Sequence, residues 1–401
     1  MSRFHSYLNS VVSILHQYDG RQPLAIFLKQ FFAANRKYGS KDRKLILHLC
    51  YCYFRLGKAL PAITAGERAL LGLYLCSMET NELLATLKAQ YNDSVNLPLA
   101  GKLELIQKGN FIEDVFPWAG ELSASIDHSK LCRSFFVRPD LFLRIRPGKK
   151  EYVSQKLSAT GIEFRERGEN CLALSNTPGL EELFEMNRDI VVQDYNSQRV
   201  GEFIRIGLAG KSGPGTFRVW DCCAASGGKS IMAFDLDPAI NLTVSDIRES
   251  ILANLKKRFA EAGIRKYKAF PIDLSIPIST LTTHDSQLTI PDSPFDLIIC
   301  DVPCTGSGTW SRTPEQLYYF EKNTIGEYVR LQRKIISNTI PQLQKDGFFL
   351  YITCSVFKKE NEEQVDFICE KFGLEIKRME VLEGYEMKAD TLFAALLVKP
   401  Y

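Results

Sequence analysis

From about residue 190 onward, short apolar segments alternate with amphipathic ones, and this alternation limits the possible folds more than any other feature of the chain. Strands that alternate with helices in this way are typical of a parallel sheet with crossover helices. We therefore predict an α/β domain with a parallel central sheet over residues 191–401. The predicted strands are residues 217–221, 242–246, 267–272, 295–301, 348–353 and 392–398, and the predicted helices are residues 229–234, 251–262, 325–343 and 361–372.

Two smaller regions precede this domain, and a chain of 401 residues is long enough to hold all three. In residues 1–125, apolar side chains recur at three- and four-residue spacing, which predicts a helical domain in which Ser40 caps a helix. Residues 126–190 change to short β-rich segments around one helix, which predicts a small α+β module. The segments behind these two predictions are residues 24–35, 44–56 and 66–75 for the first, and the helix 150–160 with the strands 162–167 and 171–174 for the second.

The net charge of +3 conceals two basic regions. Residues 1–60 contain ten Lys and Arg side chains against two acidic ones, and residues 130–167 contain ten against four. Positive charge concentrated in this way suits a polyanionic partner, although a solvated helix face gives the same pattern. No apolar stretch is long enough to cross a membrane, and the N-terminus lacks the layout of a signal peptide. We therefore expect a cytoplasmic protein without a membrane partner.

Eleven cysteines are an unusual number for such a chain, and the odd count argues against complete disulfide pairing. In a reducing cytosol they stay thiols, and most are expected to be small buried side chains. Cys50 and Cys52 lie in an apolar helical segment and are predicted to belong to the core. No pair of C-x-x-C motifs occurs, so we expect no metal site.

A glycine-containing loop follows the first predicted strand of the α/β domain. Two glycines then begin a helix, an arrangement that lets the backbone approach a ligand at the helix N-terminus. The loop is not a Walker A motif, because Cys223 stands where the first glycine would be, and it is not a G-x-G-x-x-G motif. A tight structural turn is the alternative interpretation. The residues that we expect to contact a cofactor here are Cys222, Cys223, Ala224, Ala225, Ser226, Gly227, Gly228 and Lys229.

Acidic residues end the next two predicted strands. Asp246 lies where an acid can accept hydrogen bonds from two ribose hydroxyls, and Asp273 lies where a side chain commonly touches an adenine edge. Each of them alone could instead cap a helix. Because ligands of open α/β sheets bind along the carboxyl ends of the strands, the loop and the two acids together indicate a nucleoside cofactor such as NAD or S-adenosylmethionine.

Two cysteines follow the ends of two further predicted strands. Cys304 comes after Asp301-Val-Pro, and Cys354 comes after Thr353. Carbon 5 of a pyrimidine is a poor nucleophile, but a thiolate that adds to carbon 6 makes carbon 5 able to attack an electrophilic methyl group. Asp301 could then hold the base or protonate its ring nitrogen 3, and Lys229 could supply positive charge. A second thiol could assist the elimination that releases the product.

The sequences DCCAASGGKS, SDIRES, DVPCTGSGTW and YITCSVFKKENEEQV resemble the RsmB/NOP2/Sun family of RNA cytosine-5 methyltransferases. The resemblance covers about residues 130–401, and SKDRKLILHLCYCYFR is more weakly similar to the NusB-like helical domain of bacterial 16S rRNA members. It implies a Rossmann-like class I methyltransferase domain, S-adenosylmethionine as cofactor and 5-methylcytosine in RNA as product. DNA cytosine-5 methyltransferases resemble only the Pro-Cys half of the pattern.

The resemblance also implies roles for individual residues. Cys354 would be the nucleophile, and Cys304 would assist product release. Residues 222–228, Asp246, Asp273 and Asp301 would contact S-adenosylmethionine, and Lys229 would be the lysine of the family's Gly-Gly-Lys. Arg138-Pro139 and Arg144 resemble the family's small RNA-contacting module. Ser226 departs from the family, which usually has Pro there, and Ile145-Arg146-Pro147 replaces a more usual polar pair.

Two other classes of function stay open. A non-catalytic RNA-binding or ribosome-assembly factor could retain the fold, but it would have no need for both cysteines. An NAD-dependent oxidoreductase is disfavoured by the missing G-x-G-x-x-G motif and by the absence of a histidine near the strand ends, since His284 lies in the polar loop 275–294. The NusB-like segment makes 16S rRNA the first choice of substrate and tRNA the second. A monomer is our default expectation.

Overall fold

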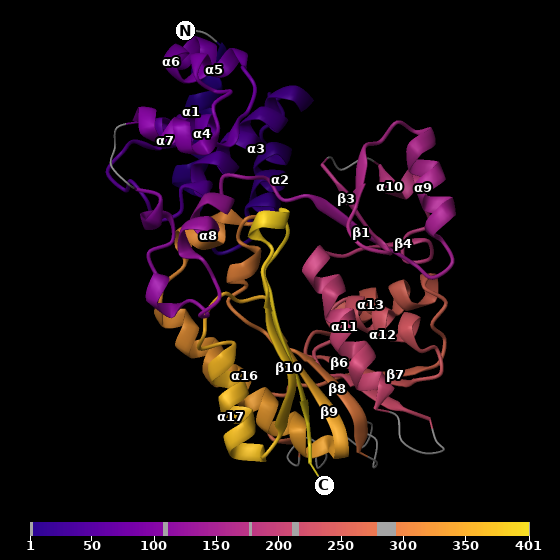
Figure 1. Cartoon of the computed structure of the whole chain (residues 1–401). Coiled ribbons are helices and arrows are strands. Elements are labelled where there is room, and N and C mark those ends of the chain that lie inside the picture. Colours follow the sequence, from indigo (N-terminus) through magenta and orange to yellow (C-terminus); the bar gives the residue numbers. More distant parts are fainter. Residues whose placement is uncertain (1–2, 107–110, 176–178, 211–215, 279–293, 401) are drawn as a thin grey trace. The chain divides into compact units, whose positions relative to one another are not determined.

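The computed structural model describes residues 3–106, 111–175, 179–210, 216–278 and 294–400 (Figure 1). The chain divides into two compact units. The helical unit comprises Met1–Leu122, Ile126–Arg138 and Thr309–Lys322, and the sheet unit comprises Ser123–Ser125, Pro139–Gly308 and Asn323–Tyr401. Most of the predicted polar loop, residues 279–293 with His284, lies outside the described residues.

The helical unit contains α-helices and short 3-10 turns over its described residues. It also takes in two helices from beyond residue 125, and one of them, α15, packs against α3. There the Tyr319 hydroxyl donates to the Tyr18 carbonyl over 2.7 Å, and the buried Glu315 carboxylate accepts from the Leu24 amide over 3.2 Å. The helices are α1 (Arg3–Gln17), α2 (Leu24–Ala34), α3 (Ser40–Arg55), α4 (Ala65–Cys76), α5 (Glu82–Leu87), α6 (Ala89–Asp93), α7 (Leu99–Ile106), α8 (His128–Ser134) and α15 (Pro314–Tyr319).

The α3–α4 contact forms the centre of this unit. The prediction that Ser40 caps α3 is wrong: Gly39 is the N-cap, and its amide donates to the Asp42 carboxylate over 2.9 Å, so Ser40 is already helical. Cys50 and Cys52 are fully buried, which confirms their predicted place in the core. Gly72 allows the closest approach, because a Cβ atom there would lie 2.1 Å from the Cys52 carbonyl oxygen.

The sheet unit begins with a small antiparallel sheet of strand order β2-β3-β1-β4. Its helix α9 and strand β3 match the predicted segments closely, whereas β4 has only three residues and was not predicted. The elements are β1 (Leu141–Ile145), α9 (Lys150–Ala159), β2 (Phe164–Glu166), β3 (Cys171–Leu174), α10 (Leu180–Leu183) and β4 (Ile190–Val192).

A seven-stranded sheet of order β10-β11-β9-β8-β5-β6-β7 follows, in a Rossmann-like arrangement. All six predicted strands are present. The prediction that residues 392–398 join a parallel sheet is wrong, because β11 pairs antiparallel with both β9 and β10. Strand β10 was not predicted, since it lies at an edge with mostly exposed or half-buried residues. The strands are β5 (Arg218–Asp221), β6 (Asn241–Asp246), β7 (Tyr267–Pro271), β8 (Phe295–Asp301), β9 (Leu343–Thr353), β10 (Glu375–Leu382) and β11 (Leu392–Val398).

Helices cover both faces of this sheet, as Figure 1 shows. Successive residues of a strand point to opposite faces, so Val219 belongs to one apolar core and Trp220 to the other. This double burial explains why the central strands are continuous apolar segments. The first core contains residues of α11 (Tyr195–Ala209), α12 (Gly228–Leu236) and α13 (Glu249–Glu261), and the second contains residues of α16 (Asn323–Thr339) and α17 (Glu362–Phe372).

We predict that Gly72→Ala lowers the free energy of unfolding by about 1–3 kcal/mol, because the new methyl group would force α3 and α4 apart. Urea denaturation followed by far-UV circular dichroism measures this loss. Gly120→Ala is the matched control, since nothing lies within 4 Å of a Cβ atom added there. Equal stability of the two variants would contradict the prediction.

Candidate active site

The predicted site residues gather at one edge of the large sheet. Strands β5, β6, β7, β8 and β9 run parallel, so their carboxyl ends lie at the same edge. Three contacts join the segments that follow these ends. The Ala225 amide donates to Asp246, Lys229 pairs with Asp301, and the Cys304 sulfur meets the Cys354 sulfur.

The loop between β5 and α12 is sharply folded. Ala225 and Gly227 have φ angles of +46° and +82°, and Gly227 is the N-cap of α12. A Cβ atom on Gly227 would lie 2.6 Å from the Phe259 ring, so only glycine fits there. The Ala224 amide donates to the Ser245 carbonyl over 2.9 Å, which ties the loop to β6.

The two cysteines of this loop differ in their surroundings. The Cys222 side chain is 1% exposed and belongs to the same apolar core as Trp220 and Cys300. Its side chain therefore faces the core, and only its backbone borders the loop. Burial raises the pKa of the Cys222 thiol well above its ordinary value. Cys223 is half-buried.

The acids after β6 and β7 already form turn hydrogen bonds. Asp246 is buried and accepts from the amides of Ala225 and Arg248, each over 3.0 Å. Asp273 is half-buried and accepts from the Ser275 amide over 2.8 Å. Such bonds are those expected of capping residues, and they also hold the two carboxylates at the sheet edge beside the loop.

Asp221, the last residue of β5, was not selected from the sequence. Its side chain is buried, Oδ2 accepts from the Ser230 hydroxyl over 2.6 Å, and Oδ1 has no hydrogen-bond partner among the described atoms. Burial raises the pKa of Asp221 to about 7, with a smaller contribution from the nearby Asp301 charge. Its place directly before the glycine loop was the sequence signal that could have identified it.

Lys229 and Asp301 form an ion pair across the site, from the first turn of α12 to the end of β8. Burial disfavours the lysine charge, but the Asp301 carboxylate outweighs burial and raises the pKa of Lys229. The Cys354 sulfur acts in the same direction, so this ammonium group is electrostatically close to that cysteine. The pair is stable as an ion pair because the two charges compensate each other at a partly buried position.

The two cysteines predicted to react lie side by side. Their sulfur atoms are 3.2 Å apart, and the Cys354 amide donates to the Cys304 sulfur over 3.4 Å. Both side chains are half-buried. The hydrogen bond with Cys354, together with burial, raises the pKa of Cys304 well above its ordinary value. Two thiols this close cannot both ionise easily, because a negative charge on one disfavours a negative charge on the other.

Glu360 joins the loops that carry these cysteines, a role that was not predicted from the sequence. The fully buried carboxylate accepts from the Thr305 amide and hydroxyl over 2.9 and 2.6 Å, and from the Ser355 hydroxyl over 2.5 Å. Gln332 donates to it over 3.0 Å. Burial raises the pKa of Glu360. Because Thr305 follows Cys304 and Ser355 follows Cys354, this one carboxylate fixes the spacing of the two thiols.

Arg144, which the resemblance places in an RNA-contacting module, forms a buried ion pair. Its side chain is 8% exposed and pairs with Asp235 of α12 over 2.5 Å. Arg146, also buried, binds the other oxygen of the same carboxylate over 2.7 Å. This guanidinium holds the small sheet against α12, and the RNA contact that the resemblance implies stays a prediction. Arg138 is exposed.

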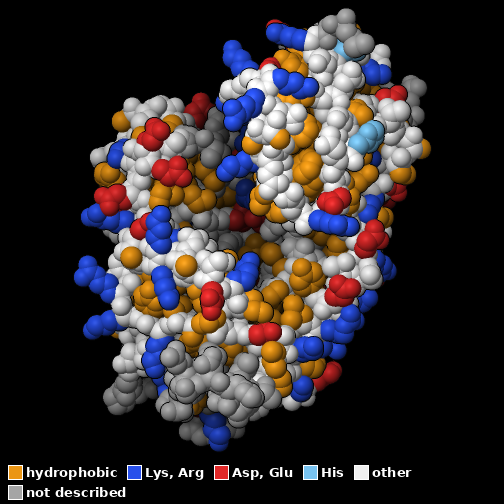
Figure 2. All heavy atoms as spheres, turned by 180° about the vertical axis from the view of Figure 1, so that it is seen from behind, with side chains coloured by type: hydrophobic (Ala, Val, Ile, Leu, Met, Phe, Trp, Pro, Cys, Tyr) orange, Lys and Arg blue, Asp and Glu red, His pale blue; other side chains and the backbone are white. Residues whose placement is uncertain are grey.

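Basic side chains of the helical unit are mostly at its surface, and Figure 2 shows Lys and Arg gathered along one edge of this unit. Arg55 is an exception, since it is buried and donates to the Phe135 carbonyl over 2.5 Å. Of the ten basic residues in segment 1–60, the exposed ones are Arg3, Arg21, Lys29, Arg36, Lys37, Lys41 and Lys44.

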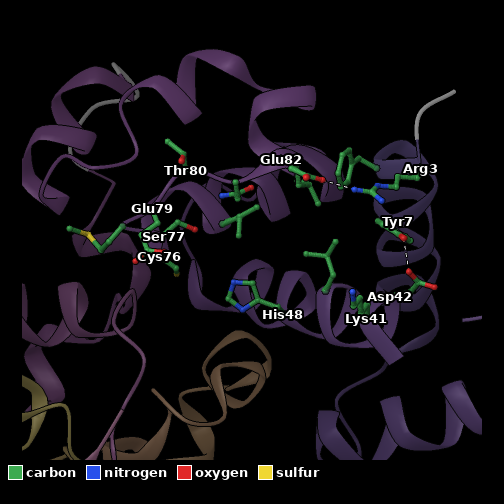
Figure 3. Close-up of a pocket in the computed structure, with 16 residues that line it drawn as sticks. Arg3, Tyr7, Lys41, Asp42, His48, Cys76, Ser77, Glu79, Thr80 and Glu82 are labelled. Carbon is green, nitrogen blue, oxygen red and sulfur yellow. Dashed lines mark hydrogen bonds and ion pairs between the residues drawn. The ribbon is translucent and has the colours of Figure 1, made fainter. Parts of the chain in front are cut away.

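The helical unit also contains a cavity of about 710 Å³ between α1, α3, α4 and α5 (Figure 3). His48 points into it from α3, and its rim carries the Arg3–Glu82 and Tyr7–Asp42 contacts. None of the predicted site residues lines it. In the described part of the chain, no group of three or more His, Cys, Asp or Glu side chains is arranged to hold a metal ion. The described helices include none with the length and apolar character needed to cross a membrane.

Comparison with known proteins gives one matching family model. Residues 214–395 match the model described as 16S rRNA methyltransferase RsmB/F. Proteins named ribosomal RNA small subunit methyltransferase B are similar to the chain: that of Xanthomonas campestris pv. campestris is 28% identical over 232 residues, and that of Yersinia enterocolitica is 28% identical over 193 residues. These matches cover 56% and 48% of this chain and 48% and 40% of the relatives, so they span about half the length of the relatives or less.

Two solved structures share the fold. The crystal structure of PH0851 superposes with a TM-score of 0.68 at 17% identity and covers 98% of each chain. The structure of NSun6 from Pyrococcus horikoshii with SFG superposes with a TM-score of 0.56 at 14% identity, over 68% of this chain and 94% of that one. The Rossmann-like fold predicted for residues 191–401 is thereby confirmed.

We predict that Asp221→Asn gains stability relative to the native protein as the pH rises from about 4 to about 7, and that the difference is constant above pH 7. The native Asp221 has a raised pKa, so its contribution to stability is complete below its unfolded pKa and is lost as the pH rises through its folded pKa. Asparagine carries no charge and escapes this loss. Urea denaturation of both proteins over this pH range is the measurement, and a pH-independent difference would contradict the raised pKa.

Proposed function

We propose that the chain, whose residues 214–395 match the model of 16S rRNA methyltransferases RsmB/F, is an S-adenosylmethionine-dependent enzyme of the RsmB/NOP2/Sun family that forms 5-methylcytosine in RNA, with 16S rRNA as its first-choice substrate. The observation that carries this proposal is the pair of thiols, Cys304 and Cys354, with their sulfur atoms 3.2 Å apart at the ends of two neighbouring parallel strands. A methyltransferase that acts on nitrogen or oxygen has no need for two thiols at that place.

The residues around the glycine loop fit S-adenosylmethionine. A left-handed glycine at the N-cap of α12 keeps the backbone open to a ligand, and the Asp221 Oδ1 atom is buried without a described partner. Asp246 and Asp273 would hold the nucleoside, and loop residues 222–228 would line it. S-adenosylmethionine, when bound, supplies the electrophilic methyl group.

Cys354 begins the proposed reaction as a thiolate. Its sulfur forms a bond to carbon 6 of the cytosine, and the electron pair of the 5,6 double bond shifts toward carbon 5. Asp301 lies beside the base and holds the Lys229 ammonium group, whose positive charge stabilises the negative character that ring nitrogen 3 gains. Carbon 5 can then attack the electrophilic methyl group.

Cys304 acts in the second half of the proposed reaction. After methyl transfer, the proton on carbon 5 passes to a water molecule, its electron pair restores the 5,6 double bond, and the carbon–sulfur bond to Cys354 breaks. The raised pKa of Cys304 suits a group that stays protonated until this stage, when its proton can pass to the departing Cys354 sulfur. Glu360 positions both cysteine loops throughout, without contact to the substrate.

The RNA would be held by exposed basic residues, among them those of the helical unit in segment 1–60. Phosphate contacts predict an affinity that falls steeply as salt rises. The target cytosine must be unpaired or flipped out of its helix to reach the thiols. A cytoplasmic monomer with a NusB-like helical domain remains our expectation, and tRNA is the second candidate substrate.

Incubation with total bacterial RNA and methyl-labelled S-adenosylmethionine tests the proposal, with digestion to nucleosides and mapping of the labelled positions. Label in 5-methylcytidine of 16S rRNA is expected. Label in tRNA alone would make tRNA the substrate in place of 16S rRNA. A chain that binds RNA without transferring label would support the non-catalytic alternative.

We predict opposite results for the two cysteine variants. Cys354→Ala should reduce transfer below detection, because no sulfur can add to carbon 6. Cys304→Ala should accumulate a covalent protein–RNA adduct that survives denaturing electrophoresis, because release from Cys354 is slowed. Cys369→Ala on α17 is the control and should transfer normally. An adduct with Cys354→Ala and none with Cys304→Ala would reverse the two assignments.

A further inference from the structure

A hydrogen-bond network links the small antiparallel sheet to the glycine loop. We propose that Arg258 of α13 is a positioning residue for loop 222–227 and that Asn187 of the small sheet's last connection holds Arg258 in place. The inference rests on the proposed function, since that function assigns the loop to S-adenosylmethionine. It makes the small sheet part of the cofactor site and not only a module for RNA.

Arg258 holds the loop through Ser226. One guanidinium nitrogen, Nη1, donates to both the Ser226 carbonyl and the Ser226 hydroxyl, over 2.8 and 2.7 Å. Ser226 lies between Ala225 and Gly227, the two residues of the loop with positive φ. A restraint on Ser226 therefore acts at the sharpest point of the turn.

Asn187 fixes the other side of the same guanidinium. Its side-chain carbonyl accepts from Arg258 Nε over 2.9 Å, and its amide nitrogen donates to Glu261 over 2.7 Å. Asn187 is buried and has a φ of +64°, a conformation that its neighbours must stabilise. The Asn187 backbone carbonyl in turn accepts from Arg146.

Arg146 extends the hydrogen-bond network to α12, the other helix that borders the loop. It pairs with Asp235 of α12, while its Nη2 atom donates to the Ala262 carbonyl just after α13. The small sheet is thus bonded to α12 and α13, the two helices that border loop 222–227. This arrangement explains why two arginines of the small sheet are buried.

Holding the Arg258 guanidinium group in a half-buried position costs free energy. Its hydrogen bonds go to uncharged oxygens of Ser226 and Asn187, and burial lowers the pKa of Arg258, with a smaller opposing contribution from Glu261. A half-buried guanidinium with neutral acceptors gains less than one in an ion pair. The gain that offsets this cost is the order it gives to the loop, where serine lacks the fixed φ that a proline would provide.

The first test measures the order of the loop without any ligand. Hydrogen–deuterium exchange of the full chain reports on the Ala224, Ala225 and Gly227 amides, which are all hydrogen-bonded. Arg258→Met should speed their exchange about tenfold, and Asn187→Gly, which keeps the positive φ, should act in the same direction. Lys256→Met is the matched control on the exposed face of α13 and should change nothing.

The second test asks whether a covalent restraint replaces the arginine. In a Ser226→Pro background, Arg258→Met should lose little further loop protection, because the proline ring restrains the backbone that Arg258 otherwise holds. Calorimetric titration with S-adenosylmethionine should show the same pattern, with about tenfold weaker binding for Arg258→Met in the serine background only. A purely structural role would lower stability equally in both backgrounds.

The outcomes separate this inference from the proposed function. Equal exchange rates in Arg258→Met and the native chain, or equal losses in the serine and proline backgrounds, overturn the positioning role. Faster loop exchange in a protein whose native form does not bind S-adenosylmethionine supports the positioning role and overturns the assignment of the cofactor.

Discussion

Parallel pairing of β8 with β5 on one side and with β9 on the other is the constraint on which the candidate site depends. It brings together side chains that are far apart in sequence, since Cys304 and Cys354 are 50 residues apart and still touch. The same pairing places Asp301 within reach of Lys229, which follows β5. Antiparallel β11 lies beyond β9 and contributes backbone support, because the Gly308 amide and carbonyl bond to Cys354 and Thr391.

A second constraint fixes the loops that carry Cys304 and Cys354, because strand pairing alone does not hold these loops in place. The Glu360 carboxylate removes that freedom by accepting hydrogen bonds from Thr305, Ser355 and Gln332. A buried carboxylate is costly unless several donors compensate it, and here the donors come from three separate segments. The acid therefore ties together the loops on which the proposed chemistry depends, although it lies outside the reacting centre.

Arginines of the sheet unit show why charge counts alone mislead. Residues 130–167 have a strong positive excess in sequence, but Arg144 and Arg146 are buried on Asp235, and Arg165 pairs with Asp140. Arg144 and Arg146 build the junction between the small sheet and α12, whereas the Arg165 pair lies within the small-sheet region. Within segments 1–60 and 130–167, the exposed basic residues lie chiefly in the helical unit, which favours RNA contacts there.

The sequence by itself determined the alternation of strands and helices, the glycine loop and the strand ends that carry Asp246, Asp301, Cys304 and Cys354. These features are local: apolar periodicity and turn residues act within a few positions of the chain. Tertiary structure decided what depends on distant partners. It reversed β11, added the exposed edge strand β10 and used Arg144 as a buried ion-pair partner. It also assigned Asp221, Glu360 and Arg258 surroundings that no local pattern records, because burial and hydrogen bonding depend on segments the chain brings together only on folding.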